Sequence, residues 1–269
     1  MSGAPMGAAA IEEAIRRANA ENRPAVVAFM TAGFPTKEAF TTMLGSLCQA
    51  ADVVEIGVPF TDPMADGLTI QRSSHTALEN GVTLDWILTT IAAGSWDAPI
   101  ILMGYLNPML AMGYDTLAQR AQDSGVAGFI VPDLPFEESA PMREPLAARG
   151  LALVQLVTPL TPLERLEQLC RASGGFVYAV TVTGITGGAQ AGAPTGDAAP
   201  DIESVGAYLD RVRSVSEIPV CAGFGIRGPE QVKGLSAHAD GVVVGSRLIE
   251  LVEAGEDPVA FVKTLHVQR

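Results

Sequence analysis

Apolar and polar positions follow two alternating patterns along the chain. Short apolar runs rich in β-branched residues are separated by longer segments with the spacing and end residues of helices. The runs are apolar on both faces, which is typical of parallel strands covered by helices. The eight predicted strands are Ala25–Met30, Asp52–Val58, Pro99–Tyr105, Gly128–Leu134, Leu151–Val157, Gly175–Thr181, Ile218–Gly223 and Gly241–Ser246.

The segments between the runs carry signals for helix ends. Thr161 precedes a sequence with the pattern of a capping box, and Gly125, Gly150 and Gly174 are positioned to end helices. Eight strand–helix units in 269 residues predict an α/β protein with a (β/α)8 TIM barrel. We expect one domain over residues 1–269, with a short extra helix at the N-terminus. No GxGxxG follows the first strand, which argues against an open dinucleotide-binding sheet.

Composition and charge limit the kinds of function that the sequence can have. Hydrophobic residues make up 48% and charged residues 17%, a balance that favours a buried parallel sheet. The formal net charge of −13 argues against nucleic-acid binding, and any phosphate site is expected to use backbone N–H groups. We expect no membrane span and no signal peptide. The three cysteines are far apart, which predicts reduced thiols and a cytoplasmic location.

Glu55 is the most informative residue, because it interrupts an otherwise apolar strand. Strand alternation places it on one face with Val53 and Gly57, and either face of a barrel strand removes a carboxyl group from water. Burial raises the pKa of such a group toward neutrality, where it can give and take a proton. The alternative is a structural ion pair, but neighbouring strands offer no basic residue at a matching depth.

A second acidic element follows the same strand. The loop from Pro59 to Gly67 contains Asp62 and Asp66 just beyond the carboxyl end of the strand, where barrel enzymes carry out their chemistry. Asp62, before Pro63, is a turn former or a functional residue. Asp66 is a turn residue, a helix cap or a second carboxylate that acts with Glu55.

Glycine-rich segments follow the last three predicted strands. They are Thr183–Gly188, Ala222–Ile226 and Val244–Ser246, and together they predict a phosphate site built from backbone N–H groups. The small, polar stretch 187–200 is a surface insertion or a mobile lid, and its position after a strand favours the lid. The three histidines show no metal-ligand spacing, and we expect no metal site.

The segment VVEIGVPFTDPMADGLTIQ (Val53–Gln71) resembles the signature of the tryptophan synthase alpha subunit family, the indole-3-glycerol-phosphate lyases. GFVYAVTVTGITG, CAGFGI and GVVVGS resemble the phosphate-binding loops of that family, and the likeness runs from about Ile11 to Val262. One departure is Leu68, which stands where the family commonly has proline.

The resemblance implies a retro-aldol cleavage of indole-3-glycerol phosphate to indole and glyceraldehyde 3-phosphate, with no metal or organic cofactor in this chain. It assigns proton transfer to Glu55 and a hydrogen bond from the indole N–H to Asp66. The substrate-binding positions that it implies are Phe29, Met103, Tyr178, Thr186, Gly187, Phe224, Gly225, Gly245 and Ser246.

The resemblance also implies a partner. Family members dock on a pyridoxal-phosphate (PLP) beta subunit in an alpha2beta2 complex and pass indole to it for L-tryptophan synthesis. Asp62, Pro63 and Pro135 match positions that face this partner.

Three alternatives remain beside this interpretation. A free-standing indole-3-glycerol-phosphate lyase would have the same residues and no need of a partner. Another phosphate-binding barrel isomerase would explain the glycine loops but not the segment from Pro59 to Gly67. A subunit that only activates its partner would be expected to have lost Glu55 or Asp66, and both are present.

Overall fold

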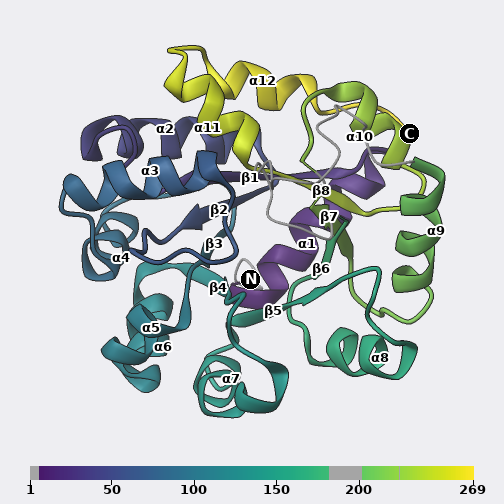
Figure 1. The fold of residues 1–269 in the computed structure, drawn as a ribbon, viewed down its shortest axis with the longest axis horizontal. Helices are drawn as coiled ribbons and strands as arrows, with labels where there is room; N and C mark the ends of the chain where they lie inside the picture. The colour runs from purple at the N-terminus through teal and green to yellow at the C-terminus, as the bar shows by residue number, and fades with distance from the viewer. Residues whose placement is uncertain (1–5, 182–201, 224) are drawn as a thin grey trace, which may run out of the picture.

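The computed structural model describes residues 6–181, 202–223 and 225–269. In these ranges eight parallel strands pair in chain order and the last returns to the first, which confirms the predicted (β/α)8 barrel (Figure 1). The strands are β1 (Ala25–Thr31), β2 (Val53–Gly57), β3 (Ile100–Met103), β4 (Val126–Ile130), β5 (Ala152–Val157), β6 (Val177–Val180), β7 (Val220–Gly223) and β8 (Gly241–Val244).

Helices follow the strands and surround the barrel (Figure 1). In the described ranges, no helix combines the length and apolarity needed to cross a bilayer. The helices are α1 (Gly7–Ala20), α2 (Lys37–Ala50), α3 (Leu68–Glu79), α4 (Leu84–Ala92), α5 (Leu106–Met112), α6 (Tyr114–Ser124), the 3-10 helix η1 (Phe136–Glu138), α7 (Ala140–Ala147), α8 (Leu163–Ala172), α9 (Ile202–Arg213), α10 (Pro229–Leu235), α11 (Ser246–Glu253) and α12 (Pro258–Thr264).

Strand alternation separates two apolar cores. Val54 and Ile56 of β2 pack in the outer core between the strands and the helices. Val53, on the opposite face of the same strand, packs inside the barrel. Glu55 shares the inward face of Val53 and pairs in register with Phe29 of β1. The strand pattern therefore directs Glu55 into the barrel, toward the carboxyl ends of the strands.

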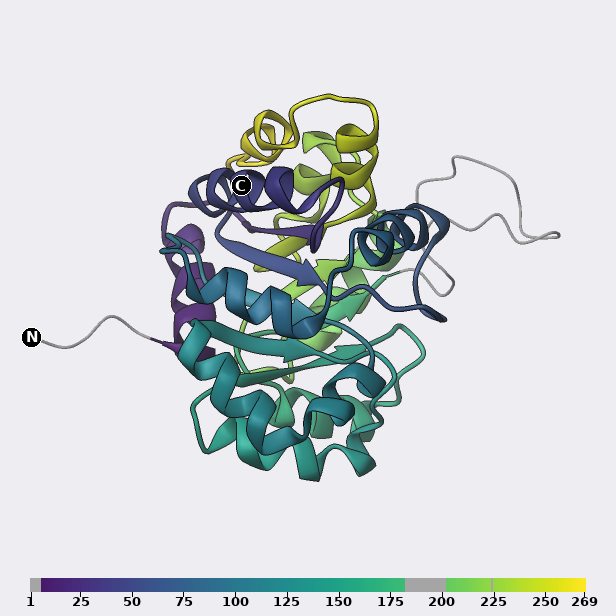
Figure 2. The same cartoon turned by 90° about the vertical axis from the view of Figure 1, so that its left-hand side faces the viewer.

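Helix α1 closes the opposite end of the barrel. Its residues Ile11, Ala14, Ile15 and Ala18 are buried in the same cluster as inward side chains of the strands. Figure 2 shows α1 at the amino ends of the strands, away from the loops that follow their carboxyl ends. Each fully buried isoleucine contributes about 2 kcal/mol of transfer free energy. The extra helix predicted at the N-terminus is thus a plug, and the interior opens at the other end.

A buried ion pair fixes the start of β2. Arg23 donates two hydrogen bonds to Asp52, at 2.7 and 2.9 Å, and Asp52 also accepts the backbone N–H of Val26. Asp52 and Arg23 are 5% and 12% exposed, so water screens this pair little. Because it joins the chain before β1 to the start of β2, the pair aligns the two strands that carry Phe29 and Glu55.

Some local predictions were wrong. Thr161 does not cap α8, because its hydroxyl accepts the N–H of Thr158 and Pro162 occupies the N-cap position. Gly174 does not end α8 in a left-handed conformation; the next residue, Gly175, adopts φ +77°. Gly125 caps α6 with φ +82°, as predicted.

The strand β4 also differs from its prediction. It begins at Val126, two residues before the predicted start, and ends at Ile130 rather than Leu134. Pro132 follows closely after this end, and proline has no N–H for the strand ladder.

Candidate active site

A cavity of about 210 Å³ opens at the carboxyl ends of the strands, which is where (β/α)8 enzymes place their active sites. Both predicted acids contribute to it. Its described lining residues are Phe29, Glu55, Ala65, Asp66, Ile70, Met103, Pro132, Leu156, Tyr178, Val180, Gly223, Gly225, Val243, Gly245 and Ser246.

Glu55 lies at the bottom of this cavity with its carboxyl group removed from water. The residue is 1% exposed, and its Oε2 atom has no hydrogen-bond partner within the described part of the chain. Burial, and secondarily the negative charge of Asp66, raise the pKa of Glu55 from its ordinary value of 4.5 to about 8. The carboxyl group is therefore mostly protonated at neutral pH and can donate a proton.

Two glycines make room for the aromatic rings beside Glu55. A Cβ atom on Gly57 would lie 2.6 Å from the ring of Phe29, and one on Gly223 would lie 2.6 Å from the hydroxyl oxygen of Tyr178. Neither glycine has a left-handed backbone, so close approach of the rings is the reason for glycine at these positions. Burial, and then the charges of the nearby acids, raise the pKa of Tyr178, which keeps the phenol neutral.

Asp66 is held by a residue that the sequence did not suggest. The hydroxyl of Tyr105, just beyond β3, donates to Oδ2 of Asp66 at 3.1 Å and accepts the N–H of Ala65 at 2.8 Å. The ring of Tyr105 stacks on Phe60, with 5.0 Å between centroids. Burial raises the pKa of Asp66, and the hydrogen bond from Tyr105 opposes that rise. Tyr105 thus stabilises both the position and the carboxylate form of Asp66.

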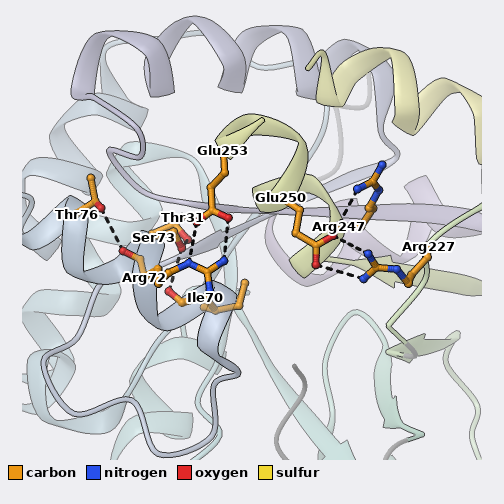
Figure 3. Close-up of polar contacts among 9 residues, drawn as sticks. All are labelled: Thr31, Ile70, Arg72, Ser73, Thr76, Arg227, Arg247, Glu250 and Glu253. Carbon is orange, nitrogen blue, oxygen red and sulfur yellow. Dashed lines mark hydrogen bonds and ion pairs between the residues drawn. The ribbon is translucent and has the colours of Figure 1, made fainter. Parts of the chain in front are cut away.

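Helix α3, which follows the Asp66 loop, is anchored to its neighbours (Figure 3). Arg72 of α3 forms an ion pair of 2.9 Å with Glu253 of α11. The hydroxyl of Ser73 lies 2.7 Å from that of Thr31, at the end of β1. These contacts position the start of the helix and therefore the loop that carries Asp66.

The wall formed by the loops after β7 and β8 has the features of an anion site. Gly225 adopts φ +59°, a left-handed conformation that favours glycine. Gly245 is the N-cap residue of α11 and Ser246 is its first residue. The first N–H groups of a helix have no partner within the helix, and they bind anions together with its dipole. The phosphate site that the glycine loops predict would lie at this wall.

The predicted site residues fall into three groups. Glu55, Asp66, Phe29, Met103, Tyr178, Gly225, Gly245 and Ser246 line the cavity together. Thr186, Gly187 and Phe224, and with them the predicted lid at 187–200, lie outside the described residues. Asp62, Pro63 and Pro135 do not line the cavity; Asp62 and Pro135 are exposed in loops that follow β2 and β4.

Other parts of the chain are weaker candidates. In the described ranges, no three His, Cys, Asp or Glu residues gather in a way that would hold a metal ion. A larger recess of about 520 Å³ lies between α1 and the starts of β3 and β4. The acids in its lining, Glu13 and Asp97, are exposed, whereas burial raises the pKa of both acids in the cavity at the carboxyl ends.

A family profile and related sequences match most of this chain. The family profile described as "Tryptophan synthase alpha chain" matches residues 15–268. A tryptophan synthase alpha chain of Nitratidesulfovibrio vulgaris is 45% identical over 261 residues, which cover 96% of this chain and 98% of the relative. One from Caulobacter vibrioides is 44% identical over 239 residues, covering 87% and 84%.

Solved structures agree with the sequence comparison. Tryptophan synthase subunit alpha of Legionella pneumophila str. Paris superposes with a TM-score of 0.84 at 31% identity, covering 97% of this chain and 98% of that chain. A chain of Mycobacterium tuberculosis tryptophan synthase gives a TM-score of 0.85 at 30% identity, with the same coverage.

Proposed function

The chain belongs to the tryptophan synthase alpha chain family, lyases of tryptophan synthesis, and on that premise we propose that it cleaves indole-3-glycerol phosphate to indole and glyceraldehyde 3-phosphate. One observation carries this proposal. Glu55, a buried carboxyl group whose Oε2 atom has no hydrogen-bond partner among the described residues, lies in the same cavity as Asp66, a carboxyl group fixed by a hydrogen bond. Two acids in such different environments suit two different tasks in one reaction.

In the proposed reaction, protonated Glu55 donates its proton to C3 of the indole ring. The bond between C3 and the glycerol carbon then breaks, and its electron pair returns to the ring. The hydroxyl on that carbon loses its proton to the Glu55 carboxylate as the aldehyde C=O forms, which restores the starting state. A pKa of about 8 suits both proton transfers near neutral pH.

Asp66 is assigned the role of stabilising the positive charge that develops on the indole nitrogen. Its carboxylate accepts a hydrogen bond from the indole N–H, and this bond strengthens as C3 is protonated. The hydrogen bond from Tyr105 supports this role, because it favours the carboxylate form of Asp66. Phe29, Met103 and Tyr178 are proposed to enclose the ring, while Gly225, Gly245 and Ser246 hold the phosphate through backbone N–H groups.

The test is indole release from indole-3-glycerol phosphate by the purified chain. Glu55→Gln keeps the shape of the side chain but cannot donate a proton from a carboxyl group, so turnover is expected to fall about 10³-fold. Glu13→Gln is the matched control, because Glu13 is exposed on α1 at the closed end of the barrel. Normal turnover by Glu55→Gln would remove Glu55 from the mechanism, and no release by the wild type would refute the reaction.

We further propose that a beta subunit covers the mouth of the cavity in an alpha2beta2 complex and supplies PLP, while this chain needs no cofactor of its own. The exposed residues around the mouth of the cavity support a partner at this position. Among the described residues, the large hydrophobic side chains that are exposed, apart from Met6, lie in segments that follow the carboxyl ends of strands. These side chains are Met64, Leu68, Leu110, Leu160 and Leu163, and they accompany Asp62, Pro63 and Pro135.

Indole release with and without a beta subunit separates an alpha subunit from a free-standing lyase. Slow release that rises sharply with the partner supports the complex, and fast release by the chain alone supports the lyase. Asp62→Asn is expected to keep turnover of the isolated chain and lose most of the stimulation. The three cysteines are buried free thiols, which suits the proposed cytoplasmic location.

A further inference from the structure

Arg227, in the loop after β7, and Arg247 and Glu250 of α11 form a charged cluster (Figure 3). Arg227 donates to both carboxylate oxygens of Glu250, at 3.2 and 2.8 Å, and Arg247 approaches the same carboxylate at 3.4 Å. Arg227 lies two residues after Gly225, and Arg247 lies directly after Ser246. Gly225 and Ser246 both line the cavity. The Cα atoms of the two arginines are therefore within about 8 Å of cavity-lining Cα atoms.

The cluster has a defined charge. Burial alone would raise the pKa of Glu250, but hydrogen bonds and charges from Arg227 and then Arg247 lower it. Glu250 is thus ionised at neutral pH, and the three side chains together carry one net positive charge.

The cavity itself has the opposite character. Its described lining includes Glu55 and Asp66 but neither lysine nor arginine, and the whole chain carries a net charge of −13. A phosphorylated substrate would approach this protein against a repulsive field. The glycine loops after β7 and β8 each continue into an arginine, so positive charge is placed where the phosphate end would arrive.

We propose that Arg227 and Arg247, joined by Glu250, attract the phosphate group of the substrate to the glycine loops and that Glu250 limits this attraction. The inference rests on the proposed function, because it assigns the phosphate end to this wall. It adds two basic side chains near the phosphate site that the sequence predicts to be built from backbone N–H groups. Arg227 and Arg247 act on the approach and binding of the substrate, not on the bond that breaks.

A purely structural role would give a different response to mutation. If the cluster only fastened the loop after β7 to α11, removal of Glu250 would break the Arg227–Glu250 contact, as removal of Arg227 does, and would also impair the enzyme. If the cluster acts by charge, the two changes have opposite effects. Arg227→Gln lowers the net charge from +1 to 0, whereas Glu250→Gln raises it to +2.

The experiment measures kcat and KM for indole-3-glycerol phosphate at low ionic strength and at about 0.5 M salt, where the Debye length is only a few ångströms. At low ionic strength, Arg227→Gln and Arg247→Gln are each expected to lower kcat/KM about threefold, through KM and with kcat unchanged. Arg227→Lys should retain most of the wild-type value, and Glu250→Gln should raise kcat/KM. All these differences should largely disappear in high salt.

The control is Arg120→Gln. Arg120 pairs with Asp85 between α6 and α4, which contribute no lining residue to the cavity, so the variant removes one positive charge elsewhere. An equal loss in Arg120→Gln and Arg227→Gln, or a loss in Glu250→Gln, would overturn the proposal.

Binding of glycerol 3-phosphate, measured by calorimetry on the same variants, separates this inference from the proposed reaction. If the wild type releases no indole, the proposed reaction fails, and the charge effect is still tested by this ligand. The dissociation constant should rise in Arg227→Gln and Arg247→Gln and fall in Glu250→Gln. If the wild type is active but neither KM nor this constant changes, the charge proposal alone fails.

Discussion

The buried acid of the active site is expected to destabilise the fold, and Glu55→Gln tests this. In the unfolded chain the carboxyl group has its ordinary pKa of 4.5, whereas burial raises it to about 8 in the folded protein. Below about pH 4.5 both states are protonated and Glu55 carries no penalty. As the pH rises toward 8, the unfolded chain ionises while the folded protein keeps its proton, so stability is progressively lost.

The magnitude follows from the difference in pKa. Each pKa unit corresponds to about 1.4 kcal/mol, so the penalty is below about 1 kcal/mol near pH 5 and reaches about 3 kcal/mol at pH 7. It levels off near about 5 kcal/mol above pH 8. Glutamine has no charge to bury at any pH, so Glu55→Gln removes this pH-dependent penalty. An unpartnered amide adds a cost that does not change with pH.

The assay is urea unfolding of the wild type and Glu55→Gln at about pH 5, 7 and 8.5. The free energy of unfolding of the variant, relative to the wild type, should increase with pH by about 3 to 4 kcal/mol across this range. A difference that is constant with pH would show that the pKa of Glu55 is not raised in the folded protein. A difference that falls with pH would mean that Glu55 is stabilised as a carboxylate, and its assignment as the proton donor would fail.

Three further predictions concern catalysis and the scaffold. Because activity is expected to depend on protonated Glu55, kcat/KM should fall as the pH increases through about 8. A pH–rate profile in which kcat/KM increases there would contradict this. Tyr105→Phe removes the donor that opposes the raised pKa of Asp66, so kcat should fall about tenfold and its acidic limb should move to higher pH; an unchanged profile would reject this role. Asp52→Asn breaks a buried ion pair and should destabilise the protein by about 3 kcal/mol in urea unfolding, with KM unchanged; an unchanged urea midpoint would contradict it.

The barrel was predictable because its signals are local. Each strand is a short run that is apolar on both faces, and its position depends little on distant residues. Glu55 was recognisable for the same reason, since a carboxyl group in an apolar strand stands out from its own neighbours. The structure adds that its Oε2 atom lacks a hydrogen-bond partner in the described ranges, which is the property that supports proton transfer.

The contacts that the sequence did not reveal join distant segments. Tyr105 bonds Asp66 across 39 positions, and no feature near Tyr105 marks it as more than a tyrosine after a strand. The Arg227–Glu250 contact joins a loop to a helix 23 positions later in the chain, and no pattern at either residue predicts that their side chains meet. Thr161 does not cap the helix, because its hydroxyl accepts a hydrogen bond from the N–H of Thr158 in a local turn.

The plug formed by α1 has a consequence for traffic through the barrel. Ile11 and Ile15 fill the amino end, so the described part of the barrel opens only at the carboxyl ends of the strands. In the proposed reaction, indole therefore leaves through the same mouth by which the substrate entered. A partner that covers this mouth would therefore lie on the path by which indole leaves the barrel.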